Sequence, residues 1–401
     1  IRNKMQHNSR NQSSTPGACS RICTALIGCA LALVGATQPL GAQTLELPGA
    51  PDLQAPVDIT PQQVEAVAKG LKWLAENQNE EGSWTAKIGY KLNNDYNFTS
   101  TTHGHVGVTS LACMAFLAGG NLPGRGPYGD NVERGLNFVL ESVQEDGYIT
   151  RHRTRMYSHA FATLFLAEIY GTTRREDVRR KLQKAVDYIV KSQNLQGGWR
   201  YEPYAQESDM SIVVCQVLAL RAARNIGIRV PKDTVDRAAK YVVDSAVSLP
   251  ASKSSGGSYM RRGIEQGTFS YQKDEYSRSS FALTSAGVTA LHGLGIYSDQ
   301  AIEKGVEYLI REMPRFNMER GIQGRGHYFF WYGHYYGVQA MYTVGSPYWE
   351  PYFVEIRDLL LGMQKHDGSW PNRTGPGDAF GTAMGVLILE IPYRFLPIFQ
   401  R

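Results

Sequence analysis

Polar residues that could carry chemistry occur where strongly apolar segments begin. In ESDMSIVVCQVLAL, Asp209 and Ser211 directly precede an apolar run. The same placement recurs at His103, His105, His159, Glu207, Glu275, Arg278, Ser279, Ser280, His327, Tyr332, His334 and Asp378. Carboxylates and imidazoles serve as general acids and bases, but Ser and Asp at such places are also ordinary helix N-caps. Both interpretations require helices, so the elements that position these residues come next.

The chain repeats one unit. In GLKWLAENQNEEGSW, Trp73 is followed by Gln at +5, Gly at +9 and Trp at +11. VDYIVKSQNLQGGW and RDLLLGMQKHDGSW have the same spacing, and three weaker copies occur. The six anchors are Trp73, Phe138, Tyr188, Tyr241, Tyr308 and Leu359. Self-similarity of this kind is the signature of a repeat architecture.

A second apolar segment follows each anchor. These segments cover residues 106–120, 158–171, 209–227, 279–295, 332–345 and 379–391. The anchor segments are amphipathic, as in VRRKLQKAVDYIVKSQ, which predicts outer helices around buried inner ones. Thr60 before Pro61, with Gln63 three residues on, predicts the first helix start. Twelve alternating helices predict an all-α fold, an α/α toroid of six helix pairs, with an open solenoid as the alternative.

Residues 1–42 are expected to be a signal peptide. They contain Arg and Lys but no Asp or Glu, and their apolar run, residues 22–36, is shorter than the roughly 20 residues of a spanning helix. The mature chain is therefore expected to be exported, periplasmic or extracellular, with a flexible lead-in over 43–57 and the toroid over 58–401. The alternative is a lipoprotein anchored through Cys29 in LIGC. No later stretch is long and apolar enough to cross a bilayer.

Charge gives no reason to expect a nucleic acid partner. The formal net charge is +5, and the leader carries Arg2, Lys4, Arg10 and Arg21 without any acidic residue. The mature chain is then close to neutral, without the basic excess that binding to phosphates requires. Cys113 and Cys215 remain after the leader. They are expected to be buried thiols, with a disulfide as the alternative.

The repeat also carries a family resemblance. Gln-x3-Gly-x-Trp after an amphipathic helix resembles the QW motif of squalene and oxidosqualene cyclases. The wider pattern, over roughly residues 60–401, resembles the prenyltransferase and squalene-oxidase repeat shared by terpenoid cyclases and protein prenyltransferase β subunits. The ending AMGVLILEIPYRFLPIFQR resembles exported proteins of planctomycete-type bacteria. The resemblance implies a toroid with a central cavity for an apolar isoprenoid or lipid ligand, and structural roles for the motif's Gln, Gly and Trp.

Both catalytic motifs of that superfamily are incomplete. ESDMSIVVCQVLAL resembles the Asp-x-Asp-Asp-Thr-Ala segment of squalene–hopene cyclases, with Ser211 at the position of the acid that protonates the polyene. It also resembles the Asp-x-Cys zinc segment of protein prenyltransferases, with Asp209 on the Asp and Ser211 at the thiolate position. His334 lies near that family's zinc-ligand His. We therefore expect neither squalene cyclisation nor a stoichiometric metal or cofactor.

Inner helices that run parallel bring their N-termini to one mouth, where helix dipoles favour polar groups. We expect the functional site there, built around Asp209, His334, His159, Arg278 and Asp378. The candidate catalytic residues are Asp209, His334, His159 and Asp378, and the candidate ligand-binding residues are Arg278, Ser211, Tyr332, Trp331 and Glu275. The aromatic run at 327–337 is expected to be its wall, with toroid core as the alternative.

Three functions fit these residues. The first is a cyclase-like or prenyltransferase-like toroid for an isoprenoid or lipid, and the second is a non-catalytic periplasmic binding or scaffold toroid. The third is a carbohydrate-active α/α barrel that uses Glu207, Asp209, Glu275 or Asp378. An apolar cavity would favour the first, a filled centre the second, and two carboxylates about 5–10 Å apart the third. The sequence leaves open whether the protein is an enzyme.

Overall fold

Six helix pairs follow one another along the chain. The computed structural model describes residues 57–90, 98–247, 266–273, 280–318, 329–373 and 375–399. They belong to one structural unit, Pro51–Arg401. The predicted leader at 1–42 and the lead-in up to residue 56 lie outside the described residues.

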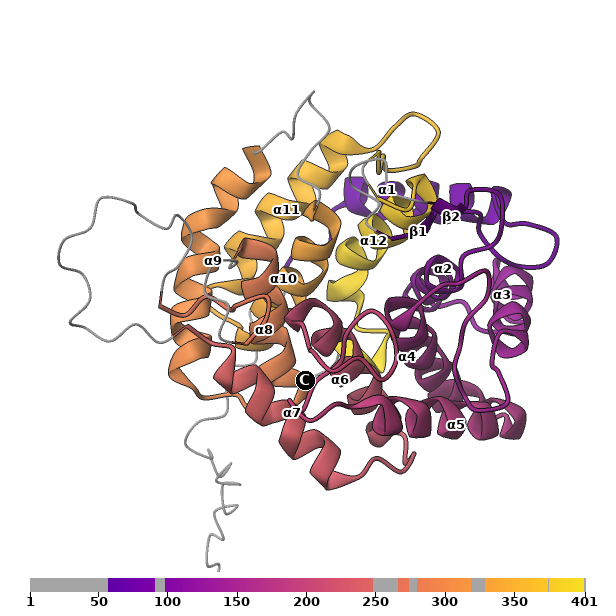
Figure 1. The fold of residues 1–401 in the computed structure, drawn as a ribbon. Helices are drawn as coiled ribbons and strands as arrows, with labels where there is room; N and C mark the ends of the chain where they lie inside the picture. Colours follow the sequence, from indigo (N-terminus) through magenta and orange to yellow (C-terminus); the bar gives the residue numbers. More distant parts are fainter. Residues whose placement is uncertain are drawn as a thin grey trace, which may run out of the picture. The chain divides into compact units, whose positions relative to one another are not determined.

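The inner ring consists of six buried helices. These are α2 (Val106–Ala118), α4 (Met156–Thr173), α6 (Met210–Asn225), α8 (Phe281–Gly293), α10 (Phe330–Val344) and α12 (Asp378–Glu390). Each inner helix packs against the next, and α12 packs against α2, so the ring closes (Figure 1). Every residue of α2 is buried, as its uninterrupted apolar sequence predicts. The structure confirms the α/α toroid and excludes the open solenoid.

The outer ring consists of amphipathic helices. These are α1 (Pro61–Glu76), α3 (Gly129–Glu141), α5 (Glu176–Ser192), α7 (Lys232–Asp244), α9 (Gln300–Met318) and α11 (Trp349–Met363). In α5, Val178, Leu182, Val186 and Ile189 form one buried stripe at helical spacing. The described residues also include a ribbon of β1 (Ile88–Gly89) and β2 (Phe98–Ser100), and the short turns η1 (Ile391–Tyr393) and η2 (Pro397–Phe399).

The first helix begins after Thr60, as the sequence predicts, but the side chain of Gln63 has a different hydrogen-bond partner from the one in a capping box. Oγ1 of Thr60 accepts a hydrogen bond from the backbone N–H of Gln63 at 3.2 Å. The Gln63 side chain does not close a capping box. Its Nε2 instead donates to the carbonyl of Leu389 at 2.7 Å, which ties α1 to the end of α12.

The repeated glutamine joins successive repeats. Its Nε2 donates to the carbonyl of the motif's own glycine and to a carbonyl of the next outer helix. The distances are 2.9 and 2.9 Å from Gln78 to Gly82 and Asn131, 2.8 and 2.9 Å from Gln193 to Gly197 and Thr234, and 2.9 and 2.8 Å from Gln364 to Gly368 and Ala66. The bond from Gln364 to Ala66 connects the last pair to the first, so the same interaction also closes the ring.

The motif's glycine and tryptophan complete this joint. Gly82, Gly197 and Gly368 have φ values of 89°, 89° and 90°, which L side chains rarely adopt. Each indole Nε1 donates to a carbonyl of its own outer helix at 2.8 Å, from Trp84 to Leu74, Trp199 to Ile189 and Trp370 to Leu360. The expectation that these residues are structural agrees with this geometry.

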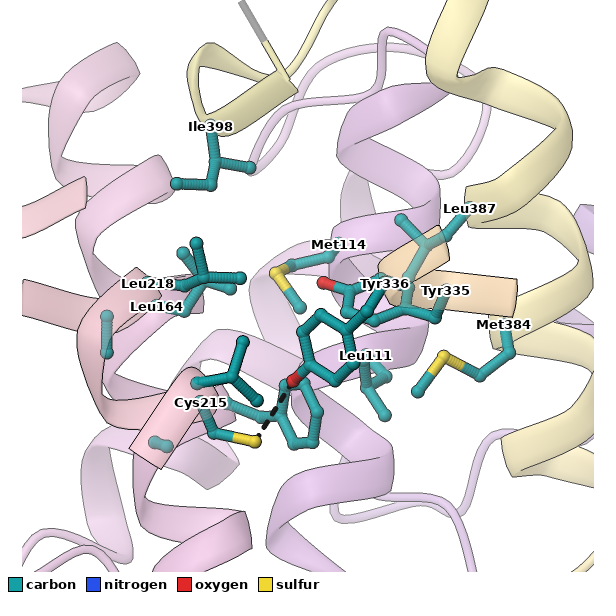
Figure 2. Packing of buried hydrophobic residues seen from close by; sticks show 14 of the residues in the cluster. Leu111, Met114, Leu164, Cys215, Leu218, Tyr335, Tyr336, Met384, Leu387 and Ile398 are labelled. Atoms are coloured by element: carbon teal, nitrogen blue, oxygen red, sulfur yellow. Dashed lines mark hydrogen bonds between the residues drawn. The ribbon is translucent and has the colours of Figure 1, made fainter. Parts of the chain in front are cut away.

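Side chains fill the centre of the ring. Leu111, Met114, Leu164, Leu218, Tyr335, Tyr336, Met384 and Leu387 belong to one hydrophobic cluster and are 0–4% exposed. Ile398, which follows α12, lies over Leu164 and Leu218 (Figure 2). The Tyr336 hydroxyl and the Cys215 thiol are 3.0 Å apart. Side chains bordering an open channel would keep exposed surface, so the described part of the ring centre is packed.

The described residues bear on three expectations, which concern the two cysteines, membrane-spanning helices and metal binding. Cys113 and Cys215 are buried and free, so the thiols are not paired with each other. In the described part of the chain, no helix is long and apolar enough to cross a membrane. Within the same residues, no group of three or more His, Cys, Asp or Glu side chains is arranged to hold a metal ion.

Two carboxyl groups are buried at the end of the toroid where the inner helices finish. Glu168 in α4 is 3% exposed, and Glu390 in α12 is 1% exposed. Burial raises the pKa of Glu168 to about 8, against the effect of a hydrogen bond from the Ile398 backbone. Burial also raises the pKa of Glu390 well above its usual value, and neither of its carboxyl oxygens has a hydrogen-bond partner among the described residues. Both groups are neutral in the folded protein at moderate pH.

We expect Glu168→Gln to remove part of the pH dependence of stability. The unfolded chain releases the Glu168 proton near pH 4.5, whereas the folded chain keeps it to about pH 8. The free energy of unfolding of the wild type is therefore unaffected by this group below about pH 4.5, and it falls as the pH rises towards 8. Across that range the variant should gain on the order of 5 kcal/mol relative to wild type. Urea unfolding from pH 4 to 9 measures this, and a pH-independent difference would contradict it.

We expect Gly368→Ala to destabilise the toroid by on the order of 2–4 kcal/mol. Gly368 has φ +90°, and an added Cβ would lie 2.5 Å from the Lys69 carbonyl oxygen of α1. The matched control is Gly362→Ala, within α11, where an added Cβ meets nothing within 4 Å. The control should stabilise by about 0.5–1 kcal/mol. Chemical unfolding measures both, and equal effects would show that the joint is unimportant.

Candidate active site

The first residues of the inner helices lie at one mouth, where loops of neighbouring repeats meet. The N–H of Met156 donates to the Tyr201 carbonyl at 3.1 Å, and the N–H of Met210 donates to the Tyr271 carbonyl at 2.9 Å. In both cases the loop of the following repeat receives the first N–H of an inner helix. These bonds satisfy donors that a helix start leaves open, and they bring Tyr201 and Tyr271 to the mouth.

Capping explains several of the polar residues found at these starts. Side chains of His105, Asp209 and Ser280 accept hydrogen bonds from the backbone N–H three residues on, at 3.2, 3.1 and 3.3 Å. Among the described residues, the cap is the one hydrogen bond that the side chains of His105 and Ser280 make. The carboxylate of Asp209 has other partners as well.

Asp209 is the centre of a hydroxyl network. Its Oδ1 accepts from the Ser211 hydroxyl at 2.5 Å, and its Oδ2 accepts from the Tyr271 hydroxyl at 3.4 Å. Tyr157 donates to the Ser211 hydroxyl at 2.7 Å, and Tyr332 donates to the Ser211 carbonyl at 3.2 Å. The hydroxyls of Tyr201 and Tyr271 are 2.6 Å apart. We call these six residues the Asp209 site: Tyr157, Tyr201, Asp209, Ser211, Tyr271 and Tyr332.

The Asp209 site is buried at its centre and partly exposed around it. Asp209 is 0% exposed and Ser211 is 8% exposed, whereas the four tyrosines are each partly exposed. Tyrosine rings present an apolar face together with a polar hydroxyl. The arrangement can therefore receive a ligand that makes both ring contacts and hydrogen bonds.

Burial also sets the electrostatics of this site. It raises the pKa of Asp209 to about 6, while hydrogen bonds from Ser211 and Ile212 and the charge of Arg200 act in the opposite direction. Arg200 itself forms an ion pair with Glu207. Burial raises the pKa of Tyr157 and Tyr332 well above the usual value, so both remain neutral donors. An acid that titrates near neutral pH and is surrounded by neutral hydroxyls can exchange a proton with a bound polar group.

His334 does not join this site. Its Nε2 lies 2.8 Å from the Asn317 amide oxygen, and its Nδ1 lies 3.1 Å from the Tyr352 hydroxyl. Its ring also contacts Phe281 and Phe316. Asn317, Phe316 and Tyr352 belong to the outer helices α9 and α11. The prediction that His334 shares a site with Asp209 is wrong, because its position on the α10 turn directs the imidazole to the outer ring.

His159 is likewise a packing residue. Its Nδ1 accepts from the Ile149 backbone N–H at 3.0 Å, and its ring packs against Tyr148 and Tyr188. Tyr188 belongs to outer helix α5. Burial lowers the pKa of His159 to about 3, so the imidazole is neutral. The predicted catalytic role is not supported by this position between α4 and α5.

Asp378 lies at the start of α12 but contacts the loop before it. Its carboxylate accepts from Lys365 Nζ at 2.6 Å and from the Asn372 N–H at 2.9 Å. The indole of Trp331 is 4% exposed and donates to the Pro371 carbonyl at 3.4 Å, again towards the α11–α12 loop. Neither side chain contacts the Asp209 site. Glu275, Arg278 and His327 lie outside the described residues.

Part of the aromatic run at 327–337 belongs to the hydrophobic core. Tyr335 and Tyr336 are 1% and 0% exposed at the ring centre, so they do not line an open cavity as predicted. Of the nine predicted site residues, the structure brings together Asp209, Ser211 and Tyr332.

Sequence reasoning missed Tyr157, Tyr201 and Tyr271. Tyr201 lies two residues after Trp199, and Tyr271 lies two residues after Phe269, which occupies the corresponding position in the next repeat. Aligning the repeats on the motif's last residue would have shown two tyrosines at equivalent places beside Asp209. Tyr157 has a weaker signal, as the second residue of inner helix α4.

We expect Ser211→Ala to raise the pKa of Asp209 above about 6, because the carboxylate loses its shortest hydrogen bond. Carbon NMR of the Asp209 carboxyl, followed from pH 4 to 9, measures the change. Ser110→Ala is a suitable control, since Ser110 is buried in α2 and donates only to the Val106 carbonyl of its own helix. An unchanged or lowered pKa in the Ser211 variant would contradict the network.

Comparisons with known proteins agree with this architecture. Residues 53–170 match the squalene-hopene cyclase C-terminal domain family. A type II terpene cyclase from Scytonema, MstE, in complex with its geranylgeranyl dihydroxybenzoate substrate, is similar with 14% identity and a TM-score of 0.55, over 84% of this chain and 98% of that chain. The α-1,6-mannanase GH76A of Salegentibacter sp. HEL1_6 is similar with 8% identity and a TM-score of 0.59, over 83% and 99%. No curated protein sequence matches the chain.

These matches establish the fold. The terpene cyclase and the mannanase have different chemistry on the same architecture, and both are similar to this chain over most of its length. The chain therefore has an α/α toroid fold, as its repeats indicate, and residues 53–170 resemble the squalene-hopene cyclase C-terminal domain. The activity has to be argued from the site.

Proposed function

We propose that this toroid is a ligand-binding protein of the squalene cyclase-like fold, and that its ligand binds at the mouth, over the Asp209 site. The observation that carries the proposal is the packed ring centre. Leu111, Met114, Leu218, Tyr336 and Leu387 are buried where a polyene would have to lie. Sites for ligands of that size enclose about 300–1,000 Å³, so a ligand is better accommodated at the partly exposed mouth.

The missing acid supports the same conclusion. Protonation of an alkene requires a carboxylic acid, and the corresponding position holds Ser211. Its hydroxyl donates to Asp209 and accepts from Tyr157, so it is held in place as part of the network. The prenyltransferase alternative is also poorly supported, because His334 is bound to Asn317 and Tyr352 in the outer layer.

The carbohydrate-hydrolase alternative has less support than ligand binding. Inactive variants of the mannanase, described in complex with mannotriose and mannotetrose, have two consecutive aspartates replaced. No two consecutive aspartates occur in this sequence. Among the predicted carboxylates, Glu207 pairs with Arg200 and Asp378 pairs with Lys365. Hydrolysis of a glycosidic bond needs a second carboxyl group beside the first.

Proton-transfer chemistry at Asp209 is the second candidate. The observation that favours it is a buried carboxyl group with a pKa of about 6 next to neutral hydroxyl donors. General acids and bases function best when their pKa lies near the working pH. In this case the ligand at the mouth would be a substrate, and Asp209→Asn would abolish turnover while retaining binding.

The proposal includes a location outside the cytoplasm. It is based on the basic, acid-free start of the sequence and the apolar run at 22–36. Expression with the native leader, followed by fractionation and N-terminal sequencing, tests it. We expect a mature N-terminus near Gln43, and an intact leader in the cytosol would contradict this part.

Ligand extraction and a cyclase assay test the main proposal. We expect no hopene-type product from squalene, and less than stoichiometric zinc by elemental analysis. Organic and aqueous extraction with mass spectrometry should identify a co-purified ligand. Tyr332→Phe and Asp209→Asn should each reduce it by roughly tenfold, since the first removes a hydroxyl at the mouth and the second removes the acceptor that orients the Ser211 and Tyr271 hydroxyls. Tyr297→Phe is the control, because Tyr297 is exposed and follows α8 at the other end of the helix. Asp209-dependent cyclisation, or a zinc ion lost in His334→Ala, would overturn the proposal.

A further inference from the structure

An exposed aromatic cluster lies beside the Asp209 site. Tyr90, just after β1, and Tyr204 are 50% and 55% exposed. Glu202 lies two residues before Tyr204 in the sequence. Its carboxylate accepts from the Tyr90 hydroxyl at 3.1 Å and lies 3.5 Å from Nη1 of Arg155. The Arg155 guanidinium also lies over the Tyr90 and Tyr201 rings, at 3.9 and 5.4 Å. We call Tyr90, Arg155, Glu202 and Tyr204 the Glu202 rim.

The backbone of Tyr204 is strained. Its φ is +61°, in the left-handed region that bulky L residues rarely adopt. The ring packs edge-on against Tyr188, with centroids 5.8 Å apart, and more than half of it stays exposed. Strained backbone of this kind is concentrated at ligand-binding positions, where the surrounding structure holds it. Here the result is an exposed aromatic ring beside a carboxylate.

Charge indicates what the rim would bind. Arg155 and Glu202 form an ion pair, so the rim has no net charge to attract an ion. The Glu202 side chain remains 50% exposed, and its carboxylate has room for more donors. Aromatic faces match the apolar C–H faces of a sugar ring, while carboxylate and tyrosine hydroxyls match its hydroxyl groups. A neutral, polyhydroxylated ligand satisfies both sets of groups.

The rim is continuous with the Asp209 site through Tyr201. The Tyr201 ring packs on Tyr157 with centroids 5.9 Å apart, and its hydroxyl lies 2.6 Å from that of Tyr271. The exposed side chains of the Glu202 rim are therefore adjacent to the buried groups around Asp209. A chain-like ligand could contact both parts at once.

We propose that the Glu202 rim and the Asp209 site together bind a neutral oligosaccharide, with Tyr90 and Tyr204 as the ring-stacking residues. This inference rests on the proposed binding function and specifies its ligand class. It requires binding only, with no bond broken.

Affinity gel electrophoresis of the mature protein tests the ligand class. The probes are a soluble α-mannan and a soluble β-glucan, with polygalacturonate as an acidic polysaccharide. We expect at least one neutral polysaccharide to retard the protein, and Tyr204→Ala to weaken binding by roughly tenfold, the change expected for one aromatic contact. Tyr297→Ala is the matched control, because Tyr297 is 57% exposed at a site after α8. Equal weakening in the control would overturn the proposal.

A second variant separates ligand contact from folding. Tyr204→Gly removes the ring and permits φ +61° without strain. We expect its thermal midpoint to be equal to or above that of wild type, while polysaccharide binding is weakened by roughly the same tenfold as in Tyr204→Ala. Retained binding in this variant would refute the role of Tyr204.

The outcomes also distinguish the two proposals. Retardation by polygalacturonate alone, or by none of the three, refutes the neutral oligosaccharide. A co-purified ligand that is not a sugar but depends on Asp209 would then leave the binding function intact. Absence of any Asp209-dependent ligand would refute the binding function as well.

Discussion

A glutamine side-chain amide links neighbouring helix pairs at three of the six joints of this toroid. Each motif glutamine donates one N–H to its own loop and the other to the next outer helix, and Gln364 donates to Ala66 to join the last pair to the first. The glycine four residues after the glutamine has a positive φ, and the next outer helix lies where a Cβ would be, so both the turn and the packing favour glycine. At these three joints the same local contact fixes one outer helix against the next, and the Gln364 joint contributes to closure of the ring.

Closure decides where chemistry can occur. Inner helices held this closely direct Leu, Met and Tyr side chains into the centre, where they pack against one another (Figure 2). Polar side chains there are expensive unless they are paired, and Glu168 and Glu390 remain neutral for this reason. Accessible polar groups are left at the mouth, where helix N-termini and loops of adjacent repeats supply partners. Asp209 has those partners and still titrates near neutral pH because it is fully buried.

Contacts that form within one helical turn could be predicted from the sequence. Asp209 caps its own helix, and Ser211 lies two residues on, so their contact depends on one turn of α6. His334 and His159 are also near inner-helix starts, but a helix rotates its side chains by about 100° per residue. Their rings face α9, α11 and α5 instead of the mouth. Which direction a helical position faces depends on the packing of neighbouring repeats, which a single sequence does not display.

The sequence by itself determined the repeat, the alternation of amphipathic and apolar helices, and the toroid, because periodic apolar positions and the Gln-Gly-Trp spacing are local properties of the chain. It also placed Ser211 at the position where the resemblance to squalene–hopene cyclases predicts an acid. Only the tertiary structure decided that the described part of the centre is filled. It alone also brings Tyr157, Tyr201 and Tyr271 into one hydroxyl network with Ser211 and Asp209. The hydrogen bonds of these three tyrosine side chains join residues up to 70 positions apart. Their geometry depends on how two repeats pack, and side-chain volume at the centre depends on all six inner helices together.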